Sequence, residues 1–289
     1  MNTPARTLRF EYGRSDHNAA RTLSLSADER VVGTEGPKLK RARVDEVSIV
    51  EVRLVEMIRD LDEANEDNDK HYGLFVWPSA LLLSRFVARE ADRLCRGKVV
   101  LELGCGTGLP SIVAGRCGAM KVYLTDRADA ADIQLNAEAN IKLNKLEGRA
   151  EFVPLTWGNM NISDDMVAIF QTVDVILAAD CFYRSEGKHF EKNSKVFFFH
   201  LTSCIFFTFL LVDFEKVIAT VALIFRCSAS SSCKFLFSYQ LRSINRSIAA
   251  LLARWGLTAK SLDKSELLND DQQQDFDSIF LYQVQQTQD

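Results

Sequence analysis

Hydrophobic and polar residues along this chain follow two periodicities, and their alternation predicts repeated strand–helix units. Short and nearly continuous apolar runs, such as 98–103 (KVVLEL) and 173–180 (VDVILAAD), are typical of strands that are covered on both faces. Apolar residues at helical spacing separate these runs and predict the covering helices. Repeated strand–helix units joined by short turns indicate an α/β fold, with an open parallel sheet and helices on both faces.

The individual elements follow from the spacing of the apolar positions. Strands are expected at 50–54, 98–103, 121–126, 150–155, 173–180, 234–239 and 278–284. Helices are expected from Pro78 onward, from a glycine-rich turn to about Cys117, and over 130–144, 214–225 and 244–255. Residues 60–70 are acidic and are expected to form a loop.

The first 45 residues are mostly polar, and we expect a flexible N-terminal arm ahead of one domain over 46–289. Phe10 and Tyr12 are the residues of this arm that would hold a short strand. The basic cluster at 37–43 (PKLKRAR) is open to two interpretations, a nuclear-import signal and a solvated tail, and short basic runs are common enough to favour the second. The N-terminus has no apolar stretch and does not predict a secretory signal.

Residues 187–212 (GKHFEKNSKVFFFHLTSCIFFTFLLV) interrupt the strand–helix alternation. A membrane span is one interpretation, but the apolar run 196–212 would reach only about 25 Å as a helix, against a hydrocarbon core of about 30 Å. A lipid-facing or partner-binding insertion is the second. The third, which we favour, is a short intron translated in frame, because Gly187-Lys188 is what a GTAAG splice donor encodes and a pyrimidine-rich tract translates into Phe and Leu. Sequencing of the spliced transcript tests it, since these codons in the main isoform would contradict it.

Composition narrows the classes of function. The chain has 289 residues, of which 47% are hydrophobic and 26% charged, so a buried core is supported and wholesale disorder is excluded. Its net charge of -4 gives no overall positive field, so nucleic-acid binding driven by bulk charge is not expected. The 7 cysteines include no C-x-x-C pair and the 4 histidines are scattered, so we expect a reducing compartment and no metal site.

The strongest chemical signal is the segment 101–110 (LELGCGTGLP), which follows a predicted strand and precedes a helix. Gly104, Gly106 and Gly108 permit a tight turn and let a ligand lie against the backbone without interference from a Cβ atom. The spacing is G-x-G-x-G and not the dinucleotide pattern G-x-G-x-x-G, and Glu102 would repel a pyrophosphate but suits a cation. The pattern resembles motif I of the seven-strand S-adenosylmethionine methyltransferases.

Further candidate site residues follow the other predicted strands. Asp126 closes the second strand, where a carboxylate can accept both hydroxyls of a ribose, and a turn or helix-cap role is the alternative. Asp180 ends the fourth strand beside the first, at the switch point of the sheet, so it would face the reacting centre unless it is a buried structural carboxylate. Trp157 would stack on a ligand and Trp77 would cover it, although single tryptophans belong more often to the core.

Together these residues resemble the family-16 protein methyltransferases, the methyltransferase-like and lysine-methyltransferase group. The matching motifs are GLFVWPSA, ELGCGTG, LTDR, LTWG and the (D/E)-x-x-(Y/F) motif from Asp180 to Tyr183, and the resemblance covers about 71–284 apart from 187–212. It implies a Rossmann-like seven-strand sheet, mostly parallel with an antiparallel last strand, and S-adenosyl-L-methionine as the cofactor. The residues implied for cofactor binding are Trp77, Glu102, Gly104, Cys105, Gly106, Gly108, Asp126, Trp157 and Ala179, and those implied for catalysis are Asp180 and Tyr183.

The resemblance also implies transfer of a methyl group to a nitrogen of a protein side chain. YGLFVWP (72–78), LTWG (155–158) and the segment 239–255 are most similar to members described as histone-arginine methyltransferases, so arginine in a histone-type substrate is the expected acceptor. Lysine as the acceptor, and an impaired cofactor-binding or interaction module, are the alternatives. A small-molecule or nucleic-acid methyltransferase on the same fold is a further one, although 180–183 lacks the prolines of a D/N-P-P-Y/F motif. A protein substrate implies a cytoplasmic or nuclear enzyme, with no sequence-specific nucleic-acid contact and no membrane contact unless 196–212 is a span.

Overall fold

The computed structural model describes residues 5–12, 48–56, 72–181, 213–240, 248–268 and 276–287. Several predictions concern residues outside these ranges: the acidic loop at 60–70, the basic cluster at 37–43, the segment 187–212, Tyr183 and the start of the helix expected at 244–255. Within the ranges that the structure describes, no helix has the length and apolar content to cross a membrane.

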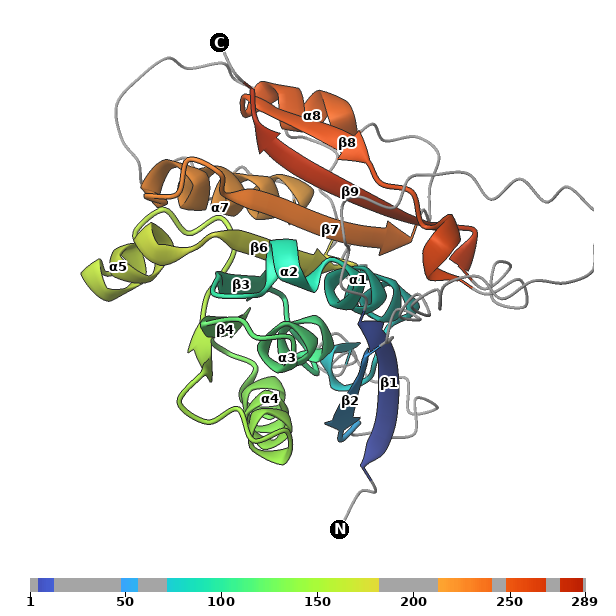
Figure 1. The fold of residues 1–289 in the computed structure, drawn as a ribbon. Helices are drawn as coiled ribbons and strands as arrows, with labels where there is room; N and C mark the ends of the chain where they lie inside the picture. Colours follow the sequence, from blue (N-terminus) through green and yellow to red (C-terminus); the bar gives the residue numbers. More distant parts are fainter. Residues whose placement is uncertain are drawn as a thin grey trace, which may run out of the picture.

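A seven-stranded sheet forms the centre of the fold, as predicted (Figure 1). Its strands are β3 (Val99–Leu103), β4 (Lys121–Asp126), β5 (Ala150–Pro154), β6 (Val175–Ala179), β7 (Lys234–Gln240), β8 (Leu257–Ser261) and β9 (Ile279–Gln286), in the spatial order β5-β4-β3-β6-β7-β9-β8. The strands from β5 to β7 in this order are parallel, and β9 is antiparallel to both β7 and β8. The strand order reverses between β3 and β6, which is where open α/β sheets bind their ligands.

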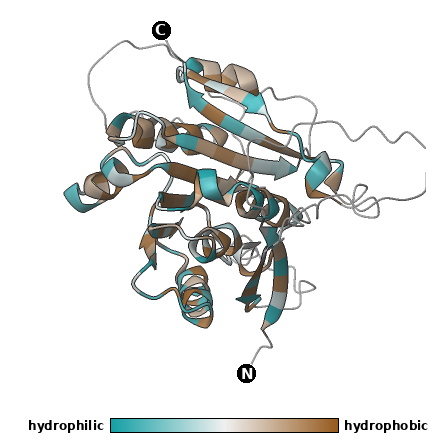
Figure 2. Cartoon of the chain, in the orientation of Figure 1, coloured by the Kyte–Doolittle hydropathy of each residue, from teal (hydrophilic) through white to brown (hydrophobic). Residues whose placement is uncertain are grey.

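Helices cover both faces of this sheet. The α-helices are α1 (Pro78–Arg89), α2 (Ala91–Leu94), α3 (Leu109–Arg116), α4 (Ala131–Leu143), α5 (Asp164–Thr172), α7 (Asp213–Cys227) and α8 (Ile248–Arg254), with 3-10 turns η2 (Tyr72–Leu74) and η3 (Ser265–Leu267). Successive strand side chains enter different cores: Val100 packs with residues of α1, α3 and α4, whereas Leu101 packs with residues of α5, α7 and α8. The central strand β6 is accordingly apolar at every position, and β3 is apolar at every position except Glu102 (Figure 2).

A separate two-stranded sheet lies beside α1, α3 and α4 (Figure 1). Its strands β1 (Arg6–Tyr12) and β2 (Ser48–Leu54) pair antiparallel, from Arg6 opposite Leu54 to Tyr12 opposite Ser48. Phe10 of β1 and Leu54 of β2 are buried in the same core as α1 and α3. The short strand expected at Phe10 and Tyr12 is therefore present, while the domain boundary near residue 45 stays a prediction.

The sequence pattern did not predict α5 and β8, and each omission has a physical reason. The α5 helix is a short one that depends on a local cap, because the Ser163 hydroxyl accepts a hydrogen bond from the Met166 N–H. The β8 strand is at the edge of the sheet and buries only Leu257 among its five residues. Its polar side chains therefore show no period-two alternation.

Candidate functional site

The turn between β3 and α3 has a backbone that requires glycine. Gly104, Gly106 and Gly108 have positive φ angles of 61°, 50° and 78°. A Cβ atom on Gly104 would lie 2.6 Å from the Trp157 ring, and one on Gly106 would lie 2.8 Å from the Gly73 carbonyl oxygen. Real Cβ atoms do not approach other atoms this closely, so the glycine loop (residues 104–108) lies between two walls, the Trp157 ring and the backbone at Gly73.

Asp126, at the carboxyl end of β4, holds this loop by hydrogen bonds. One carboxylate oxygen accepts from the Gly106 N–H at 3.0 Å, and the other accepts from the Arg127 N–H at 2.8 Å. Burial raises the pKa of Asp126, and these two N–H groups act in the opposite direction. The turn role considered as an alternative is thus present, but each oxygen keeps a second lone pair that can accept a ligand hydroxyl.

Glu102 lies in β3 directly before the loop and is fully buried, with 1% of its surface exposed. Its Oε2 accepts a hydrogen bond of 3.0 Å from the Ser111 N–H in the first turn of α3. Burial raises the pKa of Glu102 to about 8; hydrogen bonds from Ser111 lower it, and the charge of Asp126 raises it further. Two carboxyl groups that repel each other's charge create a site that favours a cationic ligand.

Cys105 lies in the loop between these acidic groups. Its N–H donates to the Thr125 carbonyl at 2.9 Å, which ties the loop to the end of β4. Its thiol is buried, and burial together with the neighbouring carboxylates raises its pKa well above the ordinary value. The thiol therefore stays protonated at neutral pH and contributes packing and not nucleophilic chemistry.

Asp180 follows β6 at the switch point and adopts an unusual backbone conformation. Its φ angle is 54°, a left-handed value that costs a non-glycine residue about 1–3 kcal/mol. Its N–H donates to the Ser238 carbonyl at 2.8 Å, and its Oδ1 accepts from the Gln240 N–H at 3.3 Å. The end of β7 thus fixes both the backbone and the carboxylate of Asp180, which is 8% exposed. Strain of this kind clusters at functional sites.

The two tryptophans have different surroundings, with Trp157 at the glycine loop and Trp77 at the start of α1. Trp157 packs against Gly104 and is half-buried, and its buried indole N–H has no acceptor among the described residues. A ligand acceptor at this position would remove the cost of that unsatisfied donor. Trp77 is the residue before α1, four residues after Gly73, and its ring lies 4.5 Å from that of Phe75, centroid to centroid.

The structure thus brings most of the predicted site residues to one edge of the sheet. Glu102, Gly104, Cys105, Gly106 and Gly108 end β3 or follow it, Asp126 ends β4, and Ala179 and Asp180 end β6 or follow it. The carboxyl ends of β4, β3 and β6 are neighbours because these strands are adjacent and parallel. Tyr183, the second predicted catalytic residue, lies outside the described residues.

Sequence reasoning missed several groups that shape this site. Gly73 supplies the carbonyl that closes on Gly106, and Cys181 has its Sγ 3.1 Å from the Leu103 carbonyl oxygen. Ser238 and Gln240 hold Asp180 from β7, although that strand lies some 60 residues later. A glycine within the YGLFVWP motif was a signal for Gly73, but no local pattern marks contacts made by backbone groups of a distant strand.

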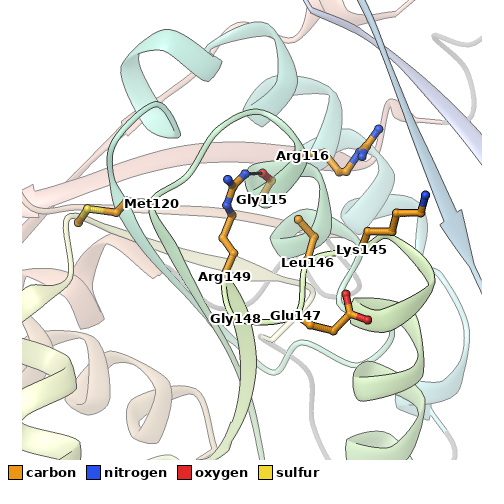
Figure 3. Close-up of a pocket in the computed structure, with 8 residues that line it drawn as sticks. All are labelled: Gly115, Arg116, Met120, Lys145, Leu146, Glu147, Gly148 and Arg149. Carbon is orange, nitrogen blue, oxygen red and sulfur yellow. Dashed lines mark hydrogen bonds between the residues drawn. The ribbon is translucent and has the colours of Figure 1, made fainter.

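A depression of about 430 Å³ lies at the opposite, amino-terminal edge of the sheet (Figure 3). Its basic lining comes from Arg116, Lys145 and Arg149, and the Arg149 guanidinium donates to the Gly115 carbonyl at 3.2 Å. These cations lie where α3 and α4 end, and cations stabilise the carbonyl end of a helix. Helix stabilisation accounts for this cluster, which lies away from the glycine loop.

The cysteine and acidic side chains within the described ranges form no group of three or more that could hold a metal ion. The site that the structure does show is built from a glycine loop, two carboxyl groups beside it, a strained aspartate at the switch point and an aromatic wall. This combination suits an organic cation held by its hydroxyls, its charge and a flat ring.

The known proteins that are similar to this chain are methyltransferases. The family model of lysine methyltransferases matches residues 59–194. The histone-arginine methyltransferase METTL23 of Xenopus laevis is 32% identical over 186 residues, which cover 64% of this chain and 65% of that protein. METTL23 of Homo sapiens is 30% identical over 184 residues, covering 64% and 79%, and the protein-lysine methyltransferase METTL21E of Mus musculus is 39% identical over 114 residues, covering 39% and 46%. The matched part of this chain thus spans somewhat less than two thirds of the frog relative.

Proposed function

The chain belongs to the methyltransferase family that includes METTL23, and from this premise we propose that it transfers a methyl group from S-adenosylmethionine to a nitrogen of a protein side chain. The observation that carries the proposal is the meeting of three features at adjacent strand ends. The glycine loop follows β3, Asp126 ends β4 and the strained Asp180 follows β6. A cofactor bound along the glycine loop and Asp126 would present its reactive end to Asp180.

The described residues fit this cofactor. The glycine loop gives a backbone surface free of Cβ atoms, and Asp126 has lone pairs for the ribose hydroxyls. The carboxyl groups of Glu102 and Asp126 favour a ligand that carries a positive sulfonium. The indole N–H of Trp157 is a buried donor without a described acceptor, beside the loop where an adenine ring would lie. The residues proposed to hold the cofactor are Trp77, Glu102, Gly104, Cys105, Gly106, Gly108, Asp126, Trp157 and Ala179.

The bound cofactor supplies an already activated methyl group, so the protein's task is alignment and charge control. Asp180 binds the acceptor cation and directs its nitrogen lone pair toward the methyl group. Arginine cannot lose its proton beforehand, because its pKa exceeds about 12, so a carboxylate must hold the guanidinium and accept the proton as transfer proceeds. Lysine would instead lose its proton before transfer, helped by desolvation. We propose that Tyr183 forms an aromatic wall beside the cation.

The similarity to relatives named histone-arginine methyltransferases favours arginine of a histone-type protein as the acceptor. The frog and human proteins named histone-arginine methyltransferases match 64% of this chain, whereas the protein-lysine methyltransferase METTL21E matches 39% of it. Lysine is the second candidate, because the family model carries that description. A histone-type substrate implies action in the nucleus or, before import, in the cytoplasm.

The division of roles between Asp126 and Asp180 provides the first test. Asn adopts left-handed backbone angles readily, so Asp180→Asn keeps the turn while removing the charge. We expect Asp180→Asn to reduce methyl transfer to histone by at least about 100-fold, as loss of a group that both orients the acceptor and takes its proton should, and to leave the S-adenosylmethionine Kd within about twofold. Asp126→Asn should raise that Kd about tenfold, the equivalent of one charge-assisted hydrogen bond.

Calorimetry measures the cofactor Kd, and transfer of a radioactive methyl group measures activity. Asp174→Asn is the matched control, since Asp174 accepts from the Val99 N–H at the opposite edge of the sheet and should affect stability alone. Equal loss of cofactor binding in the Asp126 and Asp180 variants would refute the assignment. Mass spectrometry of the methylated histone then identifies arginine or lysine as the acceptor.

A further inference from the structure

Asparagine side chains on α4 and at its end take the place of a neighbouring strand along the free edge of β2. The Asn144 amide accepts from the Arg53 N–H at 2.9 Å and donates to the Arg53 carbonyl at 2.6 Å. One helical turn earlier, the Asn140 amide accepts from the Val55 N–H at 2.7 Å and donates to the Val55 carbonyl at 3.3 Å. We call Asn140 and Asn144 the asparagine ladder.

The geometry of the ladder follows from two backbone repeats. Four residues along a helix advance about 6 Å, and two residues along a strand advance about 6.7 Å. Asparagines spaced by four on the helix therefore match Arg53 and Val55, which are spaced by two on the strand. Because β1 occupies the other edge of β2, the ladder satisfies backbone groups that would otherwise be buried without partners.

Asn140 has one contact that this structural role does not require. Its Nδ2 also donates to the Thr107 carbonyl at 3.1 Å, between Gly106 and Gly108 in the glycine loop. Asn140 is fully buried and Thr107 is 3% exposed, so water does not compete for this bond. A single amide thus joins the end of β2 to the loop, whereas the partners of the Asn144 side chain among the described residues are Arg53 and the Asn140 carbonyl.

A second hydrogen bond links the same end of β2 to the backbone segment that includes Gly73, which packs against the loop. Glu56 accepts a hydrogen bond of 2.8 Å from the Val76 N–H, and it pairs with Arg6 of β1 at 3.4 Å. Val76 precedes Trp77 and follows the η2 turn that contains Gly73. The end of the two-stranded sheet is therefore linked to the glycine loop through Asn140 and to the backbone segment that packs against the loop through Glu56.

We propose that Asn140 is a positioning residue for the cofactor, and that through it the two-stranded sheet sets the place of the glycine loop. The inference rests on the proposed function, since the loop is where S-adenosylmethionine is expected to bind. Asn140 itself touches no reacting atom; it acts through the Thr107 carbonyl. The sheet β1–β2 is accordingly a part of the cofactor site that lies outside the seven-stranded sheet.

Asn140→Asp and Asn144→Asp form a matched pair in the full-length chain. Each replaces an amide donor with an oxygen, keeps the acceptor for the β2 N–H and places a similar charge in a buried position, but only the first loses the bond to the loop. We expect Asn140→Asp to raise the S-adenosylmethionine Kd about tenfold and Asn144→Asp to change it less than twofold, while both lower the unfolding free energy. Equal changes in Kd, or none in either variant, would overturn the proposal. If either charged variant does not fold, Asn140→Ala and Asn144→Ala provide the same comparison.

Hydrogen exchange without cofactor gives a readout that does not depend on the proposed function. Loss of the Thr107 bond should speed exchange at the amides of 104–108 in Asn140→Asp, while Asn144→Asp should speed exchange only around Arg53. Wild-type protein that binds no S-adenosylmethionine would refute the proposed function, and the exchange pattern would then decide alone whether Asn140 positions the loop. Unchanged exchange at 104–108 in the Asn140 variant would show that it does not.

Discussion

Glu102 and Asp126 bring two acidic side chains to the buried base of one glycine loop. Each accepts backbone N–H groups, from Ser111 in one case and from Gly106 and Arg127 in the other. Burial raises the pKa of both, and the charge of Asp126 raises the pKa of Glu102 further. In the absence of a cation, Glu102 is therefore largely protonated near neutral pH, since its pKa is raised to about 8.

This raised pKa predicts how stability depends on pH. Between the ordinary value of 4.5 and about 8, Glu102 holds a proton in the folded protein but not in the unfolded chain. Its contribution to the unfolding free energy is fully present below pH 4.5 and is lost progressively as the pH rises toward 8, by about 1.4 kcal/mol per pH unit. Glu102→Gln, which cannot ionise, should therefore gain stability relative to wild type over this range.

Denaturant unfolding of the cofactor-free proteins at pH 5, 6, 7 and 8 measures this difference. Other titrating groups are shared by wild type and variant, so they cancel when the two unfolding free energies are subtracted. A difference that stays constant from pH 5 to pH 8 would show that Glu102 does not carry a raised pKa.

At the scale of elements, the loop between β3 and α3 is constrained by its neighbours as much as by its own glycines. A Cβ on Gly106 would meet the Gly73 carbonyl, a backbone atom that cannot rotate away. Gly256 after α8 also has a positive φ, 65°, but a Cβ there would meet nothing within 4 Å. Alanine at Gly256 would therefore carry only the cost of a left-handed backbone, whereas alanine at Gly106 would also carry the cost of a steric clash.

Gly106→Ala and Gly256→Ala should accordingly differ. Gly256→Ala should lower the unfolding free energy by about 1–2 kcal/mol, the cost of a left-handed alanine. Gly106→Ala should cost more and should also weaken S-adenosylmethionine binding, because the loop must move away from Gly73. Thermal unfolding and calorimetry on both variants check this, and similar losses in the two would mean that contact with Gly73 does not constrain the loop.

The elements that sequence could predict are those whose burial produces a continuous apolar run or a regular apolar spacing along the chain. The strands of the sheet centre, such as Val99–Leu103, are buried at every position and gave clear apolar runs. The glycine loop and Asp126 could be predicted because each directly follows or ends a predicted strand, so the signal lies within a short stretch of sequence. Asn140 was not, since its partners Val55 and Thr107 lie 85 and 33 residues away, and no pattern along α4 distinguishes an asparagine that pairs with a strand from one that faces solvent. Whether the predicted site residues bind the cofactor stays a prediction.

At the scale of the whole molecule, the connection from β6 to α7 departs from the rest of the chain. The turn from β3 to α3 and the turn from β4 to α4 are short, whereas Ala179 and Asp213 are separated by a long segment that includes the Phe-rich run 187–212. The match to the family model ends at residue 194, within that run. Even so, β6 and β7 are parallel neighbours in the sheet. The α7 helix follows β6 and precedes β7 in the chain, and it packs on the sheet as an ordinary crossover helix would.

Removal of residues 187–212 should therefore leave the sheet intact. We expect the shortened chain to fold and to bind S-adenosylmethionine at least as tightly as the full-length chain, because the glycine loop, Asp126 and Asp180 all lie outside the deletion. Circular dichroism and calorimetry on the two forms measure this. Binding by the full-length chain alone would show that the segment belongs to the working protein and would contradict its origin as a translated intron.

The asparagine ladder also has a consequence for how the chain folds during synthesis. Arg53 and Val55 find their side-chain partners 91 and 85 residues later, at Asn144 and Asn140. On a ribosome that adds about 5–20 residues per second, β1 and β2 leave the exit tunnel seconds before α4 does, and until then one edge of β2 has no partner. The edge of β2 is thus secured only after α4 has been made, and during that interval β2 presents an open edge of the kind that chaperones and other chains can pair with.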